Sequence, residues 1–218
     1  MGDGHVDLWT IALDAAPASG LDEEILSSAE LARAARLRAG RARDDFVTTR
    51  AALRRILAGY LGLPPASVPL ALREGGKPVL APHVRDLRFS VSHTRGLALC
   101  AVALGQEVGV DVEWRDPTTP WQAIAAAHFS AHELAGLMAL VQPDQRPAFF
   151  AAWTRKEAQL KGLGTGFGRP APEMEIPSGP WAVADVDVGG DYAAALAVQG
   201  EAARFRLSAW PMPKQSAA

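Results

Sequence analysis

Several features that often mark the class of a protein are scarce in this sequence. Cys100 is its one cysteine, which excludes a disulfide within the chain and fits a reducing compartment. No run of 18 apolar residues is present, and the first residues, MGDGHVDLW, lack the basic start and apolar core of a signal peptide. We therefore expect a cytoplasmic protein that has no membrane partner.

Net charge is small as well. The 22 Lys and Arg residues nearly balance the 24 Asp and Glu residues, which leaves −2 at pH 7. A protein that binds nucleic acid through its overall charge needs a positive excess. We therefore expect no nucleic-acid partner. Of the 218 residues, 49% are hydrophobic, which is ample material for a folded core.

The first half of the chain predicts a strand, two helical segments and a hairpin. Residues 6–15 form an apolar run typical of a strand, and residues 21–61 carry apolar side chains at helical spacing. Residues 89–103, FSVSHTRGLALCAVA, predict a hairpin whose turn holds residues 92–95. One face of the second helical segment carries Leu53, Ile56, Leu57 and Tyr60.

The second half has the same order of elements, without a repeat of the sequence. Residues 108–114, VGVDVEW, alternate strictly, so the three valines point one way and the residues between them the other. Helical spacing returns over 120–163, where Ser130 and Glu133 have the spacing of a capping box. Three strand-like runs follow, the first two joined as a hairpin.

The matching order of elements predicts an α+β fold built from two pseudo-symmetric α/β halves. We place the first half at residues 1–106 and the second at residues 107–218.

Acidic residues of the second half have the spacing of a cation site. Asp111 and Glu113 are two residues apart on one strand, which puts both carboxylates on one face, and Glu157 lies on a later helix, four residues before Lys161. Mg²⁺ prefers oxygen ligands of this kind, and Mn²⁺ can replace it. For either pair alone, solvated acids or a surface ion pair is the simpler explanation, but the three acids together favour a metal site.

Basic residues gather in the first helical region, and solvated helix faces explain most of them. Lys77 differs, because the two glycines before it allow close backbone approach and Pro78 fixes the exit of the chain, which suits an anionic or planar ligand. An ordinary loop is the alternative. The arginines of the region are Arg33, Arg36, Arg38, Arg41, Arg43, Arg50, Arg54 and Arg55.

Four short segments together resemble a known family. GKP at 76–78, FSVSH at 89–93, GVDVE at 109–113 and FFAAWTRKEAQLKGLGTG at 149–166 are similar, in order and spacing, to the 4′-phosphopantetheinyl transferases of the surfactin-synthetase-activating type. The helical segment that contains DDFVTTRAALRR resembles the N-terminal half of the same family. The likeness covers most of the chain, and about the last fifty residues contribute little to it.

The resemblance implies a monomer with the fold of this family, which binds coenzyme A and Mg²⁺ in a cleft between its halves. The enzyme would transfer phosphopantetheine to a serine of an apo acyl, peptidyl or aryl carrier protein and release adenosine 3′,5′-bisphosphate. By motif, Asp111, Glu113 and Glu157 would bind the metal, and Lys161 would reach the pyrophosphate.

The resemblance also implies a coenzyme site. Ser92 and His93 would contact phosphate groups, and Lys77 and Pro78 would lie near the adenine. Trp114 stands where family members often have a basic residue, which makes the contact next to the metal ligands doubtful. The complete predicted set is Arg43, Arg50, Lys77, Pro78, Ser92, His93, Asp111 and Lys161.

Phosphoryl transfer gathers charge on the bridging and leaving oxygens, which a cation and a lysine can stabilise. We assign Glu157, Lys161 and His93 to catalysis, with Glu157 as the base for the serine hydroxyl. A metal-bound water is the alternative base. Two other functions stay open, a non-catalytic binder of coenzyme A or carrier protein and a Mg²⁺-dependent pyrophosphohydrolase.

A connecting segment, residues 117–148, is apolar for its length and lies between the metal strand and the helix of Glu157. Most of its apolar side chains are expected in the core, but some are placed to form an exposed patch. We predict that this segment docks the helix of the carrier protein next to its serine, with apolar contacts supplying more of the affinity than charge. The residues concerned are Trp121, Ile124, Phe129, Leu134, Leu137, Met138 and Leu140.

Overall fold

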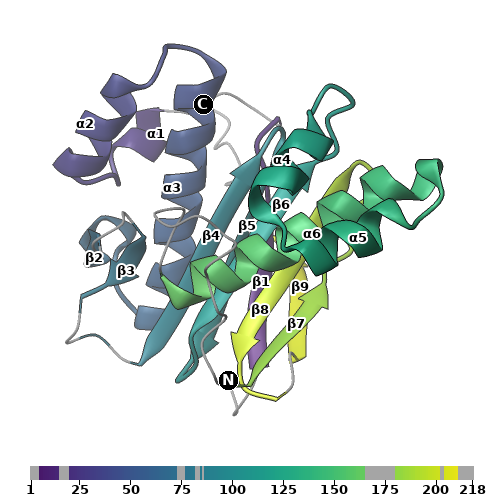
Figure 1. The fold of residues 1–218 in the computed structure, drawn as a ribbon. Helices are drawn as coiled ribbons and strands as arrows, with labels where there is room; N and C mark the ends of the chain where they lie inside the picture. Colours follow the sequence, from purple (N-terminus) through teal and green to yellow (C-terminus); the bar gives the residue numbers. More distant parts are fainter. Residues whose placement is uncertain are drawn as a thin grey trace.

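Two β-sheets stack face to face, and a long helix covers the outer face of each (Figure 1). The computed structural model describes residues 5–14, 20–72, 77–81, 84, 86–164, 180–201 and 204–210. The helices are α1 (Gly20–Glu23), α2 (Ser28–Arg36), α3 (Arg41–Leu61), α4 (Trp121–His128), α5 (Ala131–Met138) and α6 (Gln142–Leu163), with a 3₁₀ turn at Pro65–Ser67.

The first sheet has the strand order β4-β5-β1-β9 and the second the order β6-β8-β7. Strand β1 pairs antiparallel with β5 and parallel with β9, so the last strand lies in the sheet that the first half builds. The strands are β1 (His5–Ala12), β4 (Leu87–Thr94), β5 (Leu97–Leu104), β6 (Val108–Trp114), β7 (Trp181–Asp185), β8 (Tyr192–Gln199) and β9 (Arg204–Ala209), with β2 (Leu70–Leu72) and β3 (Pro78–Leu80) as a separate pair.

The two sheets confirm the predicted fold class. In the first, β5 lies between β4 and β1, and in the second, β8 lies between β7 and β6, with antiparallel pairing throughout both trios. Each trio therefore consists of one strand before the long helix and a hairpin after it. The predicted strand at 108–114, the hairpin of β7 and β8 and the capping box of Ser130 and Glu133 are all present.

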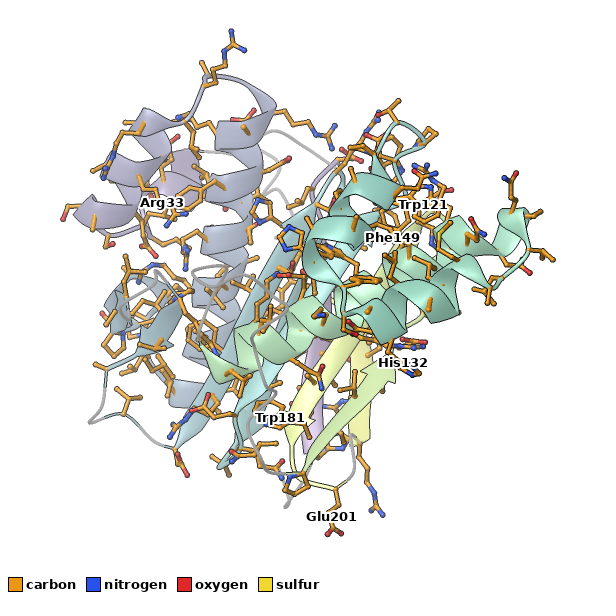
Figure 2. All side chains as sticks on the ribbon, in the orientation of Figure 1. Arg33, Trp121, His132, Phe149, Trp181 and Glu201 are labelled. Atoms are coloured by element: carbon orange, nitrogen blue, oxygen red, sulfur yellow. The ribbon has the colours of Figure 1, made fainter. Side chains whose placement is uncertain are left out.

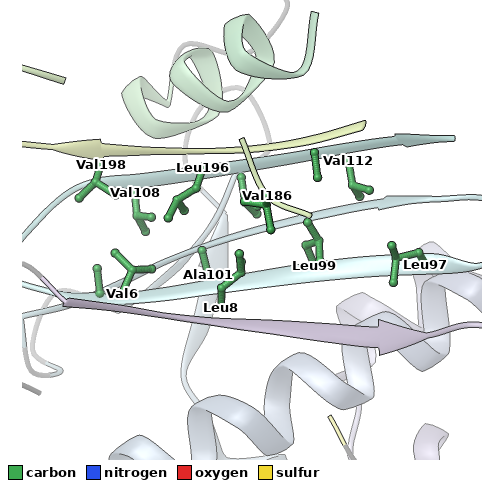
Figure 3. Packing of buried hydrophobic residues seen from close by; sticks show 13 residues of the cluster. Val6, Leu8, Leu97, Leu99, Ala101, Val108, Val112, Val186, Leu196 and Val198 are labelled. Carbon is green, nitrogen blue, oxygen red and sulfur yellow. The ribbon is translucent and has the colours of Figure 1, made fainter. Parts of the chain in front are cut away.

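The core between the sheets explains why β6 alternates so strictly. Val108, Val110 and Val112 are at most 1% exposed and pack against β1, β5 and β8 (Figure 3). A second core forms under α3, where Leu53, Ile56, Leu57 and Tyr60 share the predicted face. The valines thus fix one face of β6 in the core, which leaves the other face for α6.

Two elements of the first half differ from the sequence predictions. The hairpin turn contains only Arg95 and Gly96, because β4 continues through Thr94. The first helical segment divides into α1 and α2, since Ser27 and Glu30 form a capping box that starts a new helix.

The arginines of α3 are mostly paired, not simply solvated, because α1, α2 and nearby loops supply matching acids. The ion pairs are Arg41 with Asp14 and Asp45, Arg43 with Glu23, Arg50 and Arg54 with Glu30, and Arg55 with Asp22.

Candidate active site

Close packing of α6 on β6 brings the predicted site residues together. A side chain at Gly109 would place its Cβ 1.8 Å from the carbonyl oxygen of Ala158 and 2.4 Å from the nitrogen of Gly162, so only glycine allows this approach. Asp111 and Glu113 share the face of β6 that carries Gly109. The contact therefore brings Glu157 and Lys161 of α6 to the two strand acids.

A buried hydrogen-bonded cluster lies at this contact. The Lys161 Nζ donates to Asp111 Oδ1 at 2.5 Å and to Ser92 Oγ at 2.7 Å. Ser92 Oγ donates in turn to Asp111 Oδ1 at 2.8 Å. Asp111 and Ser92 are 2% and 5% exposed, so water competes little with these bonds.

Hydroxyl groups on alternate residues of β4 form hydrogen bonds across to β6, which belongs to the other sheet. Ser90 Oγ accepts from the backbone nitrogen of Val110, and Thr94 Oγ1 accepts from that of Trp114, both at 3.1 Å. Ser92 lies between them, and its hydroxyl group binds the Asp111 side chain instead of the backbone of β6. The polar residues near the hairpin end thus position the strand that carries the acids.

The second oxygen of Asp111, Oδ2, is buried and has no hydrogen-bond partner among the described residues. A buried carboxylate oxygen without a partner is costly, so a ligand that bound it would be favoured. Oxygen donors of this kind suit a divalent cation.

The other two acids lie beside Asp111, with Glu157 buried and Glu113 half-buried. Burial, followed by the charge of Asp111, raises the pKa of Glu113 to about 7, although a hydrogen bond from Trp153 opposes the rise. Burial and then the charge of Asp111 also raise the pKa of Glu157 to about 7, and Lys161 opposes this rise. The three carboxyl groups are therefore close enough to repel one another, which a cation would relieve.

The side chains do not form a finished metal centre. Within the described ranges, no three Asp, Glu, His or Cys side chains are arranged so that they could hold a metal ion together. Lys161 instead holds Asp111 Oδ1. The donor chemistry, the orphan oxygen and the mutual repulsion fit a cation, and its ligand set stays a prediction.

Cationic side chains of the first half lie beside the cluster. Partial burial and then the charge of Lys161 lower the pKa of His93, and Arg50 and Arg33 act in the same direction. Arg50 is only 12% exposed on its side chain and pairs with Glu30 at 3.5 Å. These groups form a positive region that an anionic ligand can neutralise.

The remaining predicted coenzyme residues lie at the edge of this region or away from it. Lys77 donates to the carbonyl oxygen of Gly162 at 3.2 Å, next to Lys161 in the chain, and Pro78 begins β3 half-buried. The glycines that precede Lys77 lie outside the described residues. Arg43 pairs with Glu23 at 2.7 Å, and no described contact joins it to the cluster.

A cavity of about 570 Å³ opens beside Glu113. Its walls include Trp153 and Phe149 of α6, and Arg95 lies over the ring of Trp114 at 4.5 Å on its rim. Sequence analysis missed Trp153 and Arg95 as site residues. Trp153 lies inside the α6 motif, which was the available signal.

The segment predicted to dock the carrier protein is only partly buried: of its seven named apolar residues, three are buried, two are half-buried and two are exposed. Trp121 lies beside Phe149 (Figure 2), and with Phe129 and Leu137 it forms a core between α4, α5 and α6. The exposed apolar side chains are found at the turn between α5 and α6. They are Met138, Leu140 and Val141, which are 51%, 41% and 66% exposed.

Comparison with known proteins agrees with this geometry. A family model described as the 4′-phosphopantetheinyl transferase superfamily matches residues 107–209. The 4′-phosphopantetheinyl transferase HetI of a Nostoc species is 35% identical over 210 residues, which cover 90% of this chain and 88% of that protein. The chain belongs to the 4′-phosphopantetheinyl transferase superfamily.

Other members of the superfamily match shorter stretches. AcpT of Escherichia coli K12 is 40% identical over 92 residues, which are 42% of this chain and 46% of AcpT. Sfp of Bacillus subtilis strain 168 is 27% identical over 124 residues, which are 57% of this chain and 54% of Sfp.

Family membership confirms the predicted enzyme class. The chain is a transferase of the holo-[acyl-carrier-protein] synthase type, which moves phosphopantetheine to carrier proteins. Family membership thus favours a transferase over the two alternatives, a non-catalytic binder and a hydrolase. None of the described helices has the length and hydrophobicity to cross a membrane.

Proposed function

We propose that the chain uses coenzyme A as the donor and a serine of an apo acyl, peptidyl or aryl carrier protein as the acceptor. The serine oxygen attacks the phosphorus that carries the pantetheine, and a new phosphate ester bond forms. The bond from this phosphorus to the bridging oxygen breaks, and adenosine 3′,5′-bisphosphate leaves with the electron pair. The serine proton passes to a base of the enzyme.

Glu157 is the base in this proposal. In the protein without a cation, burial and then the charge of Asp111 raise its pKa to about 7, so it can accept a proton near neutral pH. As a metal ligand, its carboxylate would have to serve two roles. Burial of the carboxylate at 4% exposure keeps competing water away. A water held by the metal is the alternative base, as the sequence analysis left open.

Lys161 and His93 act on the donor. Lys161, whose side chain is 30% exposed, can turn its ammonium from Asp111 to the diphosphate, where it stabilises charge on the bridging and leaving oxygens. His93, on the neighbouring strand end, can donate a hydrogen bond to a phosphate oxygen, with Ser92 beside it. This directs the reacting phosphorus toward Glu157.

Asp111, Glu113 and Glu157 would hold Mg²⁺, or Mn²⁺ in its place. When bound, such an ion neutralises diphosphate charge and orients the phosphate groups. The unpartnered Asp111 Oδ2 is the observation that supports this assignment.

The nucleotide end of coenzyme A is assigned to the first half of the chain. Arg50 lies in the positive region with His93 and can bind a phosphate group. Lys77 and Pro78 border the C-terminal end of α6 and are proposed to lie near the adenine. Arg43 stays in the proposed set as its most distant member, since Glu23 already holds it.

The carrier protein is proposed to bind a monomer of this chain in the cytoplasm, with apolar contacts leading recognition. The patch Met138, Leu140 and Val141 precedes Glu157 by 16 to 19 residues along α5 and α6. At 1.5 Å per residue of helix, the α6 part alone spans about 24 Å, so the patch would contact the carrier away from its serine. Apolar docking predicts a Michaelis constant for apo-carrier that changes little with added salt, and a many-fold rise would assign recognition to charge.

The observation that carries the proposal is the meeting of Glu157, Lys161 and Asp111 between β6 and α6. The test is to incubate the protein with coenzyme A, Mg²⁺ and a panel of apo-carriers and to weigh the carriers by mass spectrometry. We expect the mass of phosphopantetheine on a carrier serine, and roughly 100-fold or greater loss with Glu157→Gln. Unchanged carriers, or coenzyme A cleaved equally well without a carrier, would contradict the proposal.

A further inference from the structure

We infer that Lys161 competes with the divalent cation for Asp111, so that the cation and the diphosphate of coenzyme A promote each other's binding. The inference rests on the proposed function and adds an order of binding to it. The competing contact is the ion pair between Lys161 Nζ and Asp111 Oδ1 at 2.5 Å.

The two oxygens of Asp111 are occupied very unequally. Oδ1 accepts from both Lys161 and Ser92, at 2.5 and 2.8 Å, while Oδ2 is buried and has no partner among the described residues. A cation that binds Oδ2 would lie a few ångströms from the ammonium on Oδ1. In a buried site, two positive charges at that separation repel strongly. The cation therefore binds well only when Lys161 leaves.

The ammonium group of Lys161 can move away from Asp111, but another anion must replace the lost contact. Its side chain is 30% exposed, so its head can swing into solvent on a flexible stem, whereas Asp111 is fixed in β6. Leaving Asp111 costs a charge-assisted hydrogen bond, which the oxygens of a diphosphate can replace. The diphosphate thus frees Asp111 for the cation, and the cation in turn releases Lys161 for the diphosphate.

The neighbouring Lys156 offers a matched comparison. It lies on the same helix, but its Nζ donates to the carbonyl oxygen of His128 and to Glu133, both at 2.9 Å. Its removal deletes one positive charge near Glu157 without freeing an oxygen of Asp111. If Lys161 competes for Asp111, removing Lys161 should change the affinity for the cation and removing Lys156 should not. If only the total charge near the site matters, removing either lysine should change the affinity to a similar extent.

The test measures binding of Mn²⁺ without turnover. Free Mn²⁺ is counted by electron paramagnetic resonance in wild type, Lys161→Met and Lys156→Met, with and without coenzyme A, in the absence of carrier. Protein-free samples calibrate the complex of Mn²⁺ with coenzyme A. Lys161→Gln, which keeps a donor for Ser92, serves as a second variant if Lys161→Met melts early.

We expect coenzyme A to tighten Mn²⁺ binding about tenfold in wild type. In Lys161→Met, Mn²⁺ alone should bind about tenfold tighter than in wild type, and coenzyme A should add little. Lys156→Met should behave as wild type. Equal Mn²⁺ affinity in the two lysine variants, or an undiminished effect of coenzyme A in Lys161→Met, would overturn the inference. Carrier modification that persists in EDTA would instead refute the proposed metal.

Discussion

The two long helices lie on equivalent faces of the two sheets, yet the buried charged residues that they carry differ in their partners. On α3, Arg54 is 2% exposed, and its guanidinium donates to Glu30 and to the carbonyl oxygens of the turn after the helix. On α6, Glu157 is similarly buried but faces other carboxyl groups. Buried charge whose partners are all within the protein stabilises the fold, whereas buried charge that lacks them marks a place that a ligand completes.

The largest expected effect is a loss of stability when the close contact between α6 and β6 at Gly109 is disturbed. Gly109→Ala would push a methyl group into the backbone of α6 at Ala158, and we expect the free energy of unfolding to fall by more than about 4 kcal/mol. Gly136→Ala is the control, because open space surrounds Gly136 in α5 and alanine favours a helix by up to about 1 kcal/mol. Urea titrations measure both. Equal stability of the two variants would contradict the close packing of α6 on β6.

Removing a paired charge from α3 should affect stability and spare the chemistry. Arg54→Met leaves Glu30 and three carbonyl oxygens short of a donor, so we expect a loss of about 3 kcal/mol. Arg36→Met, on the exposed face of α2, should cost at most about 0.5 kcal/mol. If carrier modification per folded Arg54→Met molecule fell many-fold, the division between the two helices would be wrong.

Removing the charge of Asp111, which only one of its two oxygens shares with partners, should reduce the activity more than the stability. Asp111→Asn keeps the volume and a bond with Ser92 but loses the anionic oxygens, so we expect turnover to fall roughly 100-fold or more. The melting temperature should fall less than that of Arg54→Met, because losing the ion pair with Lys161 is partly offset by removing charge from Oδ2, which has no partner among the described residues. Rates come from carrier mass spectra and melting from calorimetry. A stability loss as large as that of Arg54→Met would refute the comparison.

The smallest expected effect concerns pH. Partial desolvation of the His93 ring and then the charge of Lys161 hold the pKa of His93 below its ordinary value of 6.5 in the folded protein. The unfolded chain therefore binds the proton more readily, so stability is lost as the pH falls below about 6.5 and is fully present above it. His93→Gln should show a smaller drop in urea midpoint between pH 7.5 and 5.5 than wild type. Because water still reaches the ring, parallel drops within error would remove His93 as a contributor.

The sequence predicted the parts of the site that depend on local periodicity. The alternation around Asp111 fixed which face of β6 it occupies, and the spacing of Glu157 and Lys161 fixed their common face on α6. The pairing of Arg54 with Glu30 depends on contact between α2 and α3, which no local pattern encodes. The hold of Lys161 on Asp111 likewise depends on how closely α6 approaches the sheet. The exposure of Met138 could not be separated from the burial of Leu137 by composition alone.

The return of β9 to the first sheet has a consequence for how the chain folds. Arg206 of β9 donates to Asp7 of β1 at 3.0 Å, across 199 residues of sequence. The first sheet is therefore incomplete until β9 has left the ribosome, and contacts of such long range slow folding. Until then the free edge of β1 can pair with another extended chain. Newly made molecules thus depend on their last strand to protect their first one from aggregation.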